Sequence, residues 1–282
     1  MNEDFADPIT IALQEDIGTG DVTTQFFVAA GLQGCGRIVA RERCIVAGTE
    51  TAAEVFRRLD PQLHIDLLQQ DGAALNGGET ILEVRGTASS ILTAERVALN
   101  FLQRLSGTAT ITRQFVEAVG KYPAKILDTR KTTPGLRALE KAAVVAGGGA
   151  NHRSGLYDMA LVKDNHLGTR LGFSGFADAI QQLHKERPGL RIELEADNLE
   201  QVHAFLGIDG VDVILLDNMN PAEMREAVAL GKKRVKFEAS GGVTLKNVRQ
   251  IAATGVDYIS VGAHTNSARA IDLSLELTHV AA

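Results

Sequence analysis

Basic side chains are concentrated between residues 128 and 166, although the whole chain carries a formal net charge of −6 at pH 7. They are Arg130, Lys131, Arg137, Lys141, Arg153 and Lys163, set against Asp128, Glu140, Asp158 and Asp164. Arginine offers a planar fork and lysine a point charge, and both suit carboxylates and phosphates. A solvated charged face is the alternative. We favour an anionic ligand because these residues lie beside apolar, strand-like runs (KIL and MALV).

Two carboxylates, Glu195 and Asp217, end two consecutive predicted strands, and Asn218 follows the second. Oxygen ligands of this kind suit Mg²⁺, with water and a substrate phosphate completing the coordination. The alternative is that each carboxylate pairs with a nearby lysine or arginine. We favour contact with a metal or a substrate.

Two glycine turns follow late strands, in EASGG (238–242) and SVGA (260–263). Glycine lets the backbone approach a phosphate, and a helix N-terminus favours an anion. The first turn leads into a predicted helix that Thr244 caps. Glycine turns alone are weak evidence, but phosphate often binds after the last strands of α/β barrels.

The roles of two histidines and one lysine stay open. His152, beside Arg153, is either a ligand contact or a polar residue at a helix end, and His166 is as readily structural as functional. Lys163, at a strand end, is also a candidate Schiff-base lysine. That chemistry needs a depressed pKa, which burial and neighbouring cations would favour.

Six short apolar strands alternate with helices from Lys125 onward, which predicts a parallel sheet. The strands are 125–129, 159–164, 191–196, 212–218, 235–240 and 258–263, and the main helices are 136–146, 175–187, 199–206, 221–230 and 245–254. Side chains alternate along a strand, so Arg191, Glu193 and Glu195 share one face, as do Lys236, Glu238 and Ser240. Charge on one face favours a barrel with a polar interior over an open sheet covered by helices on both sides.

The preceding part predicts a mixed α+β domain. A helix begins at Pro8, strands are expected at 37–46, 63–68 and 80–84, and Thr49 is the expected cap of a helix ending near Leu59. Another helix starts after Thr93, Gly107 interrupts it, and a further helix reaches about Val119. We therefore expect an N-terminal α+β domain over 1–108 and a barrel domain over 109–269, with 270–282 packing back on the first.

Composition narrows the class of protein. The chain has no stripe of basic residues of the kind that binds nucleic acid. No apolar run reaches membrane-spanning length, and the N-terminus does not show the pattern of a signal peptide. Cys35 and Cys44 match no metal or disulfide spacing and read as small buried residues. A cytoplasmic location is expected.

The stretch from 128 to 166, with TRKT-x-PG-x-R, NHR and KDNH, resembles the signature region of the quinolinate phosphoribosyltransferase family. The similarity extends to ED-x-G-x-GD-x-T (15–23), AER-x-x-LN (94–100), E-x-E (193–195) and LLDN (215–218). The resemblance implies an N-terminal α+β domain, an incomplete TIM-like α/β barrel with fewer than eight strands, and a homodimer or higher homo-oligomer with shared active sites. It also implies conversion of quinolinate and phosphoribosyl pyrophosphate to nicotinate mononucleotide, pyrophosphate and CO₂ with Mg²⁺, in NAD biosynthesis.

The resemblance also implies roles for individual residues. Arg130, His152, Arg153 and Lys163 would bind the quinolinate carboxylates, and Arg96 would enter the partner subunit's site. Lys131 would face the ligand anions, and with Lys163 it joins Glu195 and Asp217 as catalytic candidates. Glu195 and Asp217 would lie near the ribose and Mg²⁺. The 5′-phosphate would be bound by Ser240, Gly241, Gly242, Gly262 and Ala263.

Three other functions stay open: a related phosphoribosyltransferase with another acceptor such as nicotinate, a Schiff-base lyase acting through Lys163, and a non-catalytic anion-binding module. The last would need the basic residues but not the Glu195 and Asp217 pair.

Overall fold

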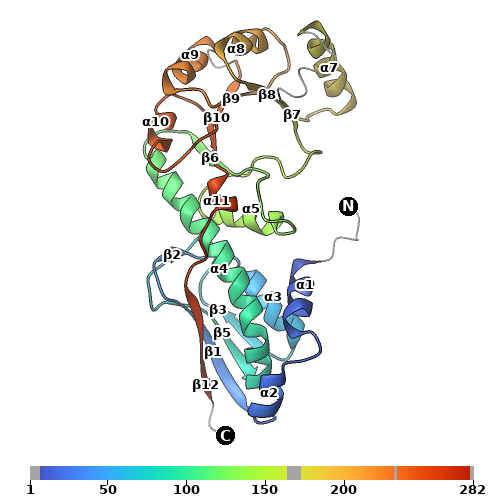
Figure 1. The fold of residues 1–282 in the computed structure, drawn as a ribbon, viewed down its shortest axis with the longest axis vertical. Coiled ribbons are helices and arrows are strands. Elements are labelled where there is room, and N and C mark those ends of the chain that lie inside the picture. Colours follow the sequence, from blue (N-terminus) through green and yellow to red (C-terminus); the bar gives the residue numbers. More distant parts are fainter. Residues whose placement is uncertain (1–6, 164–172, 232–233, 280–282) are drawn as a thin grey trace. The chain divides into compact units, whose positions relative to one another are not determined.

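The computed structural model describes residues 7–163, 173–231 and 234–279 (Figure 1). The chain divides into two compact units. The N-terminal unit consists of Met1–Arg113, Thr133–Gly148 and Ser267–Ala282, and the barrel unit consists of Gln114–Thr132 and Gly149–Asn266. Within the described ranges, none of the helices combines the length and apolarity that crossing a bilayer requires.

The N-terminal unit is built on a four-stranded antiparallel sheet in the order β12-β1-β5-β3. Its strands are β1 (Gln33–Ala40), β3 (His64–Leu67), β5 (Thr80–Thr87) and β12 (Leu273–His279). β12 lies in the segment expected to return to this part of the chain, and it pairs with β1. The strand predicted over 37–46 is wrong in its second half, because residues 44–45 form a separate strand, β2 (Cys44–Ile45), which pairs with β4 (Ala74–Leu75).

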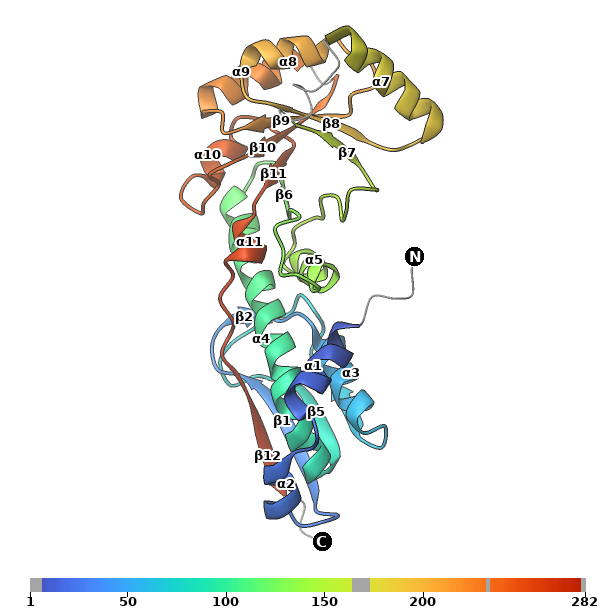
Figure 2. The same cartoon turned by 45° about the vertical axis from the view of Figure 1, so that its right-hand side comes forward.

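Several helices belong to the N-terminal unit, and those that begin at Thr49 and Ala88 pack against this sheet (Figure 2). The helices are α1 (Pro8–Ile17), α2 (Val22–Phe27), α3 (Thr49–Leu59), α4 (Ala88–Val119) and α5 (Arg137–Ala146), of which α4 belongs to both units. Ile38 and Leu82 of the sheet share one buried cluster with Phe56 of α3 and with Ile91 and Leu102 of α4. Burial of such side chains contributes roughly 1.5–3 kcal/mol each.

The predicted break in the long helix at Gly107 is wrong, because α4 runs without interruption from Ala88 to Val119. Gly107 has another role. A Cβ atom there would lie 2.0 Å from the backbone oxygen of Arg269. The glycine therefore allows the chain before β12 to pass close to the helix, at the expense of helix propensity.

Thr49 is not the N-cap of α3, which is a second correction. The helix begins at Thr49, and Gly48 occupies the cap position with φ of 88°. The carboxylate of Asp71 accepts hydrogen bonds from the amides of Gly48 and Thr49, both at 2.9 Å. A side chain from a distant turn thus satisfies donors that a local cap would otherwise satisfy.

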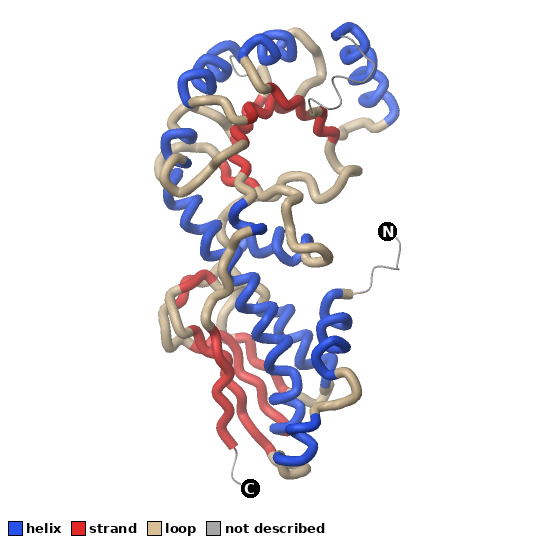
Figure 3. Tube along the Cα trace, in the orientation of Figure 1, coloured by secondary structure: helices blue, strands red, loops and turns tan. Residues whose placement is uncertain are grey.

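The barrel unit contains a six-stranded parallel sheet in the order β6-β11-β10-β9-β8-β7. Its strands are β6 (Lys125–Leu127), β7 (Ala160–Val162), β8 (Ile192–Ala196), β9 (Val213–Asp217), β10 (Lys236–Ser240) and β11 (Tyr258–Ser260). They follow an arc in Figure 3, and within the described ranges the edge strands β6 and β7 do not pair with each other. The prediction of an incomplete barrel with fewer than eight strands is confirmed.

Helices α7 (Phe173–Glu186), α8 (Leu199–Leu206), α9 (Pro221–Gly231) and α10 (Val248–Ala252) lie on the outside of the arc (Figure 1). Asn220 caps α9 as predicted, because its side-chain oxygen accepts from the amides of Ala222 and Glu223. The prediction that α10 begins at Leu245 with Thr244 as its cap is wrong. Thr244 instead donates to Asn247 within a turn, and the helix starts only at Val248.

The inner face of the arc is polar, as the alternation of charges predicted. Glu193 is 1% exposed, Glu195 8% and Glu238 2%. The other side chains of β8 are apolar and buried, and the alternate residues of β10, Phe237 and Ala239, are too. The sheet therefore turns its carboxylates toward the interior of the arc and its apolar residues toward the helices.

Candidate active site

A cavity of about 190 Å³ opens at the carboxyl ends of the barrel strands. It is lined by Thr129, Arg130, Lys131, His152, Arg153, Leu161, Lys163, Glu195, Leu215, Glu238, Ser240 and Ser260. Functional groups in α/β barrels collect at this end of the strands. Four of the six basic residues singled out in the sequence thus converge on one cavity, together with Glu195 and Ser240, whereas Arg137 and Lys141 lie on α5 and do not line it.

Arg153 and Arg130 give the cavity its preference for anions. Arg153 is 9% exposed, and burial lowers the pKa of its guanidinium, which the positive charge of Arg130 lowers further. Two such charges held near each other repel, and an anion between them relieves that repulsion. A planar carboxylate matches the two guanidinium forks.

Lys131 is held through its main chain. Its amide donates to the hydroxyl oxygen of Thr129 at 3.1 Å, and its carbonyl accepts from the buried hydroxyl of Thr265 at 2.7 Å. A Cβ atom on Gly262 would lie 3.3 Å from Cδ of Lys131. The turn after β11, which includes Gly262 and leads into α11 (Ala263–Asn266), therefore supports Lys131.

Glu195 pairs with Lys163, as the alternative interpretation of this carboxylate predicted. Nζ of Lys163 lies 2.5 Å from Oε2 of Glu195, and the lysine side chain is 43% exposed whereas the side chain of the glutamate is buried. The pair places an ammonium and a carboxylate together at the cavity wall. Either partner is available to a charged ligand that displaces the other.

Asp217 lies at the end of β9, the next strand in the sheet, and accepts a hydrogen bond from the side-chain amide of Asn218 at 2.7 Å. Asn218 has a positive φ of 54°. Gly241 packs against it with φ of 91°, and a Cβ there would lie 2.1 Å from Oδ1 of Asn218. Only glycine fits this position, so Gly241 shapes the strand end beside Asp217.

The floor of the cavity is a buried cluster of His152, Glu193 and Glu238. Nε2 of His152 lies 3.0 Å from Glu193 Oε2 and 3.5 Å from Glu238 Oε2. A second cavity, of about 170 Å³, is lined by all three residues, whereas the first is lined by His152 and Glu238 only. Sequence reasoning assigned no function to Glu193 or Glu238. The only available signal was their place on the charged face of two strands.

Burial and hydrogen bonding act on this cluster in opposite directions. Burial lowers the pKa of His152, but the two carboxylates raise it to about 9. Burial also raises the pKa of Glu193 to about 7, against the hydrogen bond from His152. Nδ1 of His152 accepts from the Arg153 amide at 2.8 Å, which opposes protonation of that nitrogen. A cationic ring would direct a hydrogen on Nδ1 at this amide, so the geometry favours the neutral ring with its hydrogen on Nε2 over the cation that the raised pKa alone would imply.

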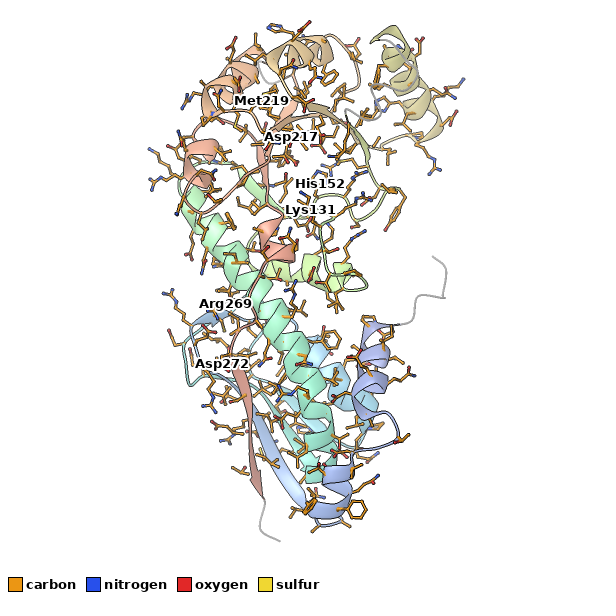
Figure 4. All side chains as sticks on the ribbon, viewed as in Figure 1. Lys131, His152, Asp217, Met219, Arg269 and Asp272 are labelled. Carbon is orange, nitrogen blue, oxygen red and sulfur yellow. The ribbon has the colours of Figure 1, made fainter. Side chains whose placement is uncertain are left out.

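The other predicted site residues fall in three groups. Ser240 lines the cavity, and of the described residues Asp217, Gly241, Gly242, Gly262 and Ala263 lie at neighbouring strand ends without lining it. Arg96 is exposed on α4 within the N-terminal unit. Asp164, Asn165 and His166 lie outside the described residues. Figure 4 shows Lys131, His152 and Asp217 within the barrel unit.

An incomplete parallel barrel with an anion-binding cavity at the carboxyl ends of its strands defines an α/β-barrel enzyme for acidic substrates. Comparison with known families is more specific. Residues 21–106 match the quinolinate phosphoribosyl transferase N-terminal domain, and residues 108–276 match the C-terminal domain. The chain belongs to the quinolinate phosphoribosyl transferase family.

Individual relatives agree with this assignment. A probable nicotinate-nucleotide pyrophosphorylase (carboxylating) from Synechocystis is 44% identical over 271 residues, covering 94% of this chain and 90% of its own. The Mycobacterium leprae nicotinate-nucleotide pyrophosphorylase (carboxylating) is 44% identical over 280 residues, covering 96% of each chain. A solved nicotinate-nucleotide pyrophosphorylase from Francisella tularensis, at 40% identity, superposes with a TM-score of 0.89 over 96% of this chain and 94% of that one.

Proposed function

We propose that this protein transfers the phosphoribosyl group of phosphoribosyl pyrophosphate to quinolinate in NAD biosynthesis. The products are nicotinate mononucleotide, pyrophosphate and CO₂. The observation that carries the proposal is the cavity in which Arg130, Lys131, Arg153 and Lys163 converge beside Glu195, in a chain that matches both family domains. One substrate is a dicarboxylate and the other a polyphosphate, so the enzyme needs such a basic cavity.

Quinolinate would bind through its two carboxylates at Arg130, Arg153 and Lys163, with His152 at the cavity floor. The closeness of Arg130 to the buried Arg153 supports this, because an anion offsets their repulsion. Once the ring nitrogen is ribosylated, the cationic pyridinium accepts the electron pair that the departing 2-carboxylate leaves behind. The protein then has mainly to orient the ring and exclude water.

The carboxylates of Glu195 and Asp217 would act on the ribose. Departure of pyrophosphate leaves positive charge at the ribosyl carbon, and negative groups nearby stabilise that charge as it develops. The two residues belong to the adjacent strands β8 and β9, which supports a common role. Lys131 would face the phosphates, and Ser240, Gly241, Gly242, Gly262 and Ala263 would surround the 5′-phosphate.

Mg²⁺ fits the donors at this end of the barrel. It prefers oxygen ligands and is commonly held by one or two carboxylates together with substrate phosphates. Glu195 and Asp217 would supply the carboxylate oxygens, and the ion would neutralise charge on the pyrophosphate. Because Glu195 is paired with Lys163, the residue would divide its oxygens between the ion and the lysine.

The working unit would be a homodimer or a higher homo-oligomer with shared sites. Arg96 is exposed on α4, and the basic residues of the cavity belong to the other unit of the chain. An exposed arginine in this position is available to a second copy. We propose that Arg96 completes the partner's quinolinate site.

The test is a coupled assay of pyrophosphate release with quinolinate and with nicotinate as alternative acceptors. We expect turnover with quinolinate, dependent on Mg²⁺ and accompanied by CO₂. Turnover with nicotinate alone would reassign the acceptor. Borohydride trapping of a covalent adduct on Lys163 would support a Schiff-base lyase instead. The ion pair with Glu195 counts against that chemistry, which needs a neutral amine.

A further inference from the structure

The buried carboxylates Glu193 and Glu238 have no part in the chemistry described above. They are 1% and 2% exposed; Glu238 lines both cavities of the barrel unit, and Glu193 lines the second. Burying two carboxylates costs folding free energy unless a partner compensates for their lost hydration. Their shared neighbour is the imidazole of His152, so their role must act through that ring.

The directions of the hydrogen bonds around His152 follow from its neighbours. The backbone N–H of Arg153 can only donate, so Nδ1, at 2.8 Å, is the acceptor. The hydrogen of the neutral imidazole is therefore on Nε2, which faces Glu193 at 3.0 Å. The amide of His152 donates in turn to the fully buried carboxylate of Asp128 at 2.8 Å. Ring and main chain are both fixed.

We infer that Glu193 and Glu238 are positioning residues that act through His152 on Arg153. By accepting the Nε2 hydrogen they keep Nδ1 available to the Arg153 amide, and this bond fixes the main chain from which the Arg153 guanidinium extends into the cavity. Both ring nitrogens then have protein partners, and His152 serves as a link between the strands and the arginine. The inference rests on the proposed function only for the identity of the anion.

A metal ion is the competing occupant of this cluster. The three side chains offer ligand atoms within 4.8 Å of one another. A histidine that binds a metal through Nε2 usually donates its Nδ1 hydrogen to an oxygen acceptor. Here Nδ1 accepts instead, which places a hydrogen on Nε2, where the metal would bind. Neither oxygen of Glu193 has a donor in strict hydrogen-bond geometry among the described residues. The carboxylate therefore acts on the ring through its 3.0 Å contact with Nε2, which favours a hydrogen on that nitrogen.

The first test compares Glu193→Gln with Glu193→Leu. Glutamine keeps an acceptor oxygen without the charge, whereas leucine leaves the Nε2 hydrogen without an acceptor. We expect Glu193→Leu to raise the KM for quinolinate about tenfold or more, with the KM for phosphoribosyl pyrophosphate nearly unchanged, and Glu193→Gln to restore most of the loss. Glu83→Leu, which removes a buried carboxylate from the sheet of the N-terminal unit, is the control and should leave both constants unchanged.

Glu238→Gln and Glu238→Leu provide the parallel pair, should a Glu193 variant fail to fold. A double variant with His152→Ala tests the route. Once the imidazole is absent, Glu193→Leu should add little further loss. Fully additive losses, or equal losses of both substrates, would overturn the inference. If Glu193→Gln and Glu193→Leu raise the quinolinate KM equally, and only the wild type binds Zn²⁺ or Mn²⁺, the cluster is a metal site.

The second test does not depend on activity. The ¹⁵N shifts of histidine ring nitrogens distinguish a protonated from an unprotonated nitrogen, and wild-type His152 should show the hydrogen on Nε2. In Glu193→Leu the tautomer preference and the Arg153 amide shift should both change. A wild type that is inactive on quinolinate but shows these shifts would refute the proposed function alone. A wild type with the hydrogen on Nδ1 would refute the positioning role alone.

Discussion

Arg153 is the most deeply buried of the basic residues around the cavity. We expect Arg153→Ala to weaken quinolinate binding by about 2–5 kcal/mol, because it removes a desolvated charged partner. The binding of phosphoribosyl pyrophosphate should be weakened much less. Calorimetric titration with each substrate measures the difference, and Arg41→Ala, an exposed arginine on the other unit, is the control. Equal losses for both substrates would exclude a carboxylate-binding role.

Glu195 and Asp217 should act on turnover more than on affinity. Glu195→Gln and Asp217→Asn preserve shape and remove charge, so they should lower kcat while leaving the quinolinate KM close to wild type, because positive charge develops at the ribosyl carbon only on the way to the transition state. Steady-state kinetics at saturating Mg²⁺ provides the measurement. A raised KM with unchanged kcat would instead indicate a simple binding role.

Functional residues at the ends of strands were easier to predict from the sequence than those inside the strands. Arg130, Lys131 and Lys163 were recognisable because they directly follow apolar strands, and Arg153 because it belongs to the same locally basic stretch. Glu193 and Glu238 were not, because alternation shows that they share a face with other polar residues but does not reveal His152 as their partner. That pairing comes from the curvature of the sheet.

Helices and strands were predicted correctly where their cause is local in the sequence, and wrongly where it lies in a distant segment. All six barrel strands were predictable because each is an apolar run followed by a helix. Gly107 was misjudged because the chain passing beside it, at Arg269, lies far away in sequence. Gly48 was missed as the cap of α3 for the same reason, since Asp71 satisfies the helix donors from another turn.

Gly107→Ala should therefore destabilise the protein although alanine favours helices. The propensity gain of about 1 kcal/mol is opposed by a Cβ placed 2.0 Å from the Arg269 oxygen. Overpacking of this kind typically costs about 1–3 kcal/mol, and backbone is less able to move away than a flexible side chain. Urea unfolding is the measurement. Gln114→Ala, an exposed position of the same helix, should be neutral or slightly stabilising, and an equally stable Gly107→Ala would show that the chain at Arg269 shifts freely.

Glu42 links the chain around β12 to the turn after β1. Its carboxylate accepts from the Arg269 guanidinium and the Asp272 amide, and both residues are labelled in Figure 4. The hydrogen bond from Arg269 is the main cause that lowers the pKa of Glu42 from 4.5 to about 2. A lowered pKa contributes stability above the unfolded value, and the contribution is lost as the pH falls from about 4.5 to about 2.

Glu42→Gln should accordingly cost about 1 kcal/mol near neutral pH, a modest value because water screens a partly exposed pair. The difference from wild type should shrink as the pH falls through this range. Chemical denaturation at a series of pH values measures it. Glu50→Gln, which removes an exposed partner of Arg57, is the control. A difference independent of pH would mean that the charge of Glu42 contributes nothing to stability through either Arg269 or the Asp272 amide.

At the scale of the whole molecule, the proposed sharing of Arg96 predicts complementation. Arg96→Ala and Arg153→Ala chains should each be inactive, yet mixing them with subunit exchange should restore about a quarter of wild-type activity. About half of randomly formed dimers are mixed, and each mixed dimer has one site with both arginines. Activity of the mixture after exchange of differently tagged chains is the measurement. Absence of recovery despite proven exchange would place Arg96 in its own chain's site or in none.

The antiparallel pairing of β12 with β1 also constrains how the protein is made. β1 meets β5 early in translation, but its other edge stays open until residues 273–279 have left the ribosome. Every strand of the barrel unit has been synthesised by then. An uncovered strand edge is a template for pairing with other chains. The nascent protein therefore carries an open strand edge on the earliest strand that it makes until the last strand has been synthesised, and a chaperone that covers this edge would protect it during that time.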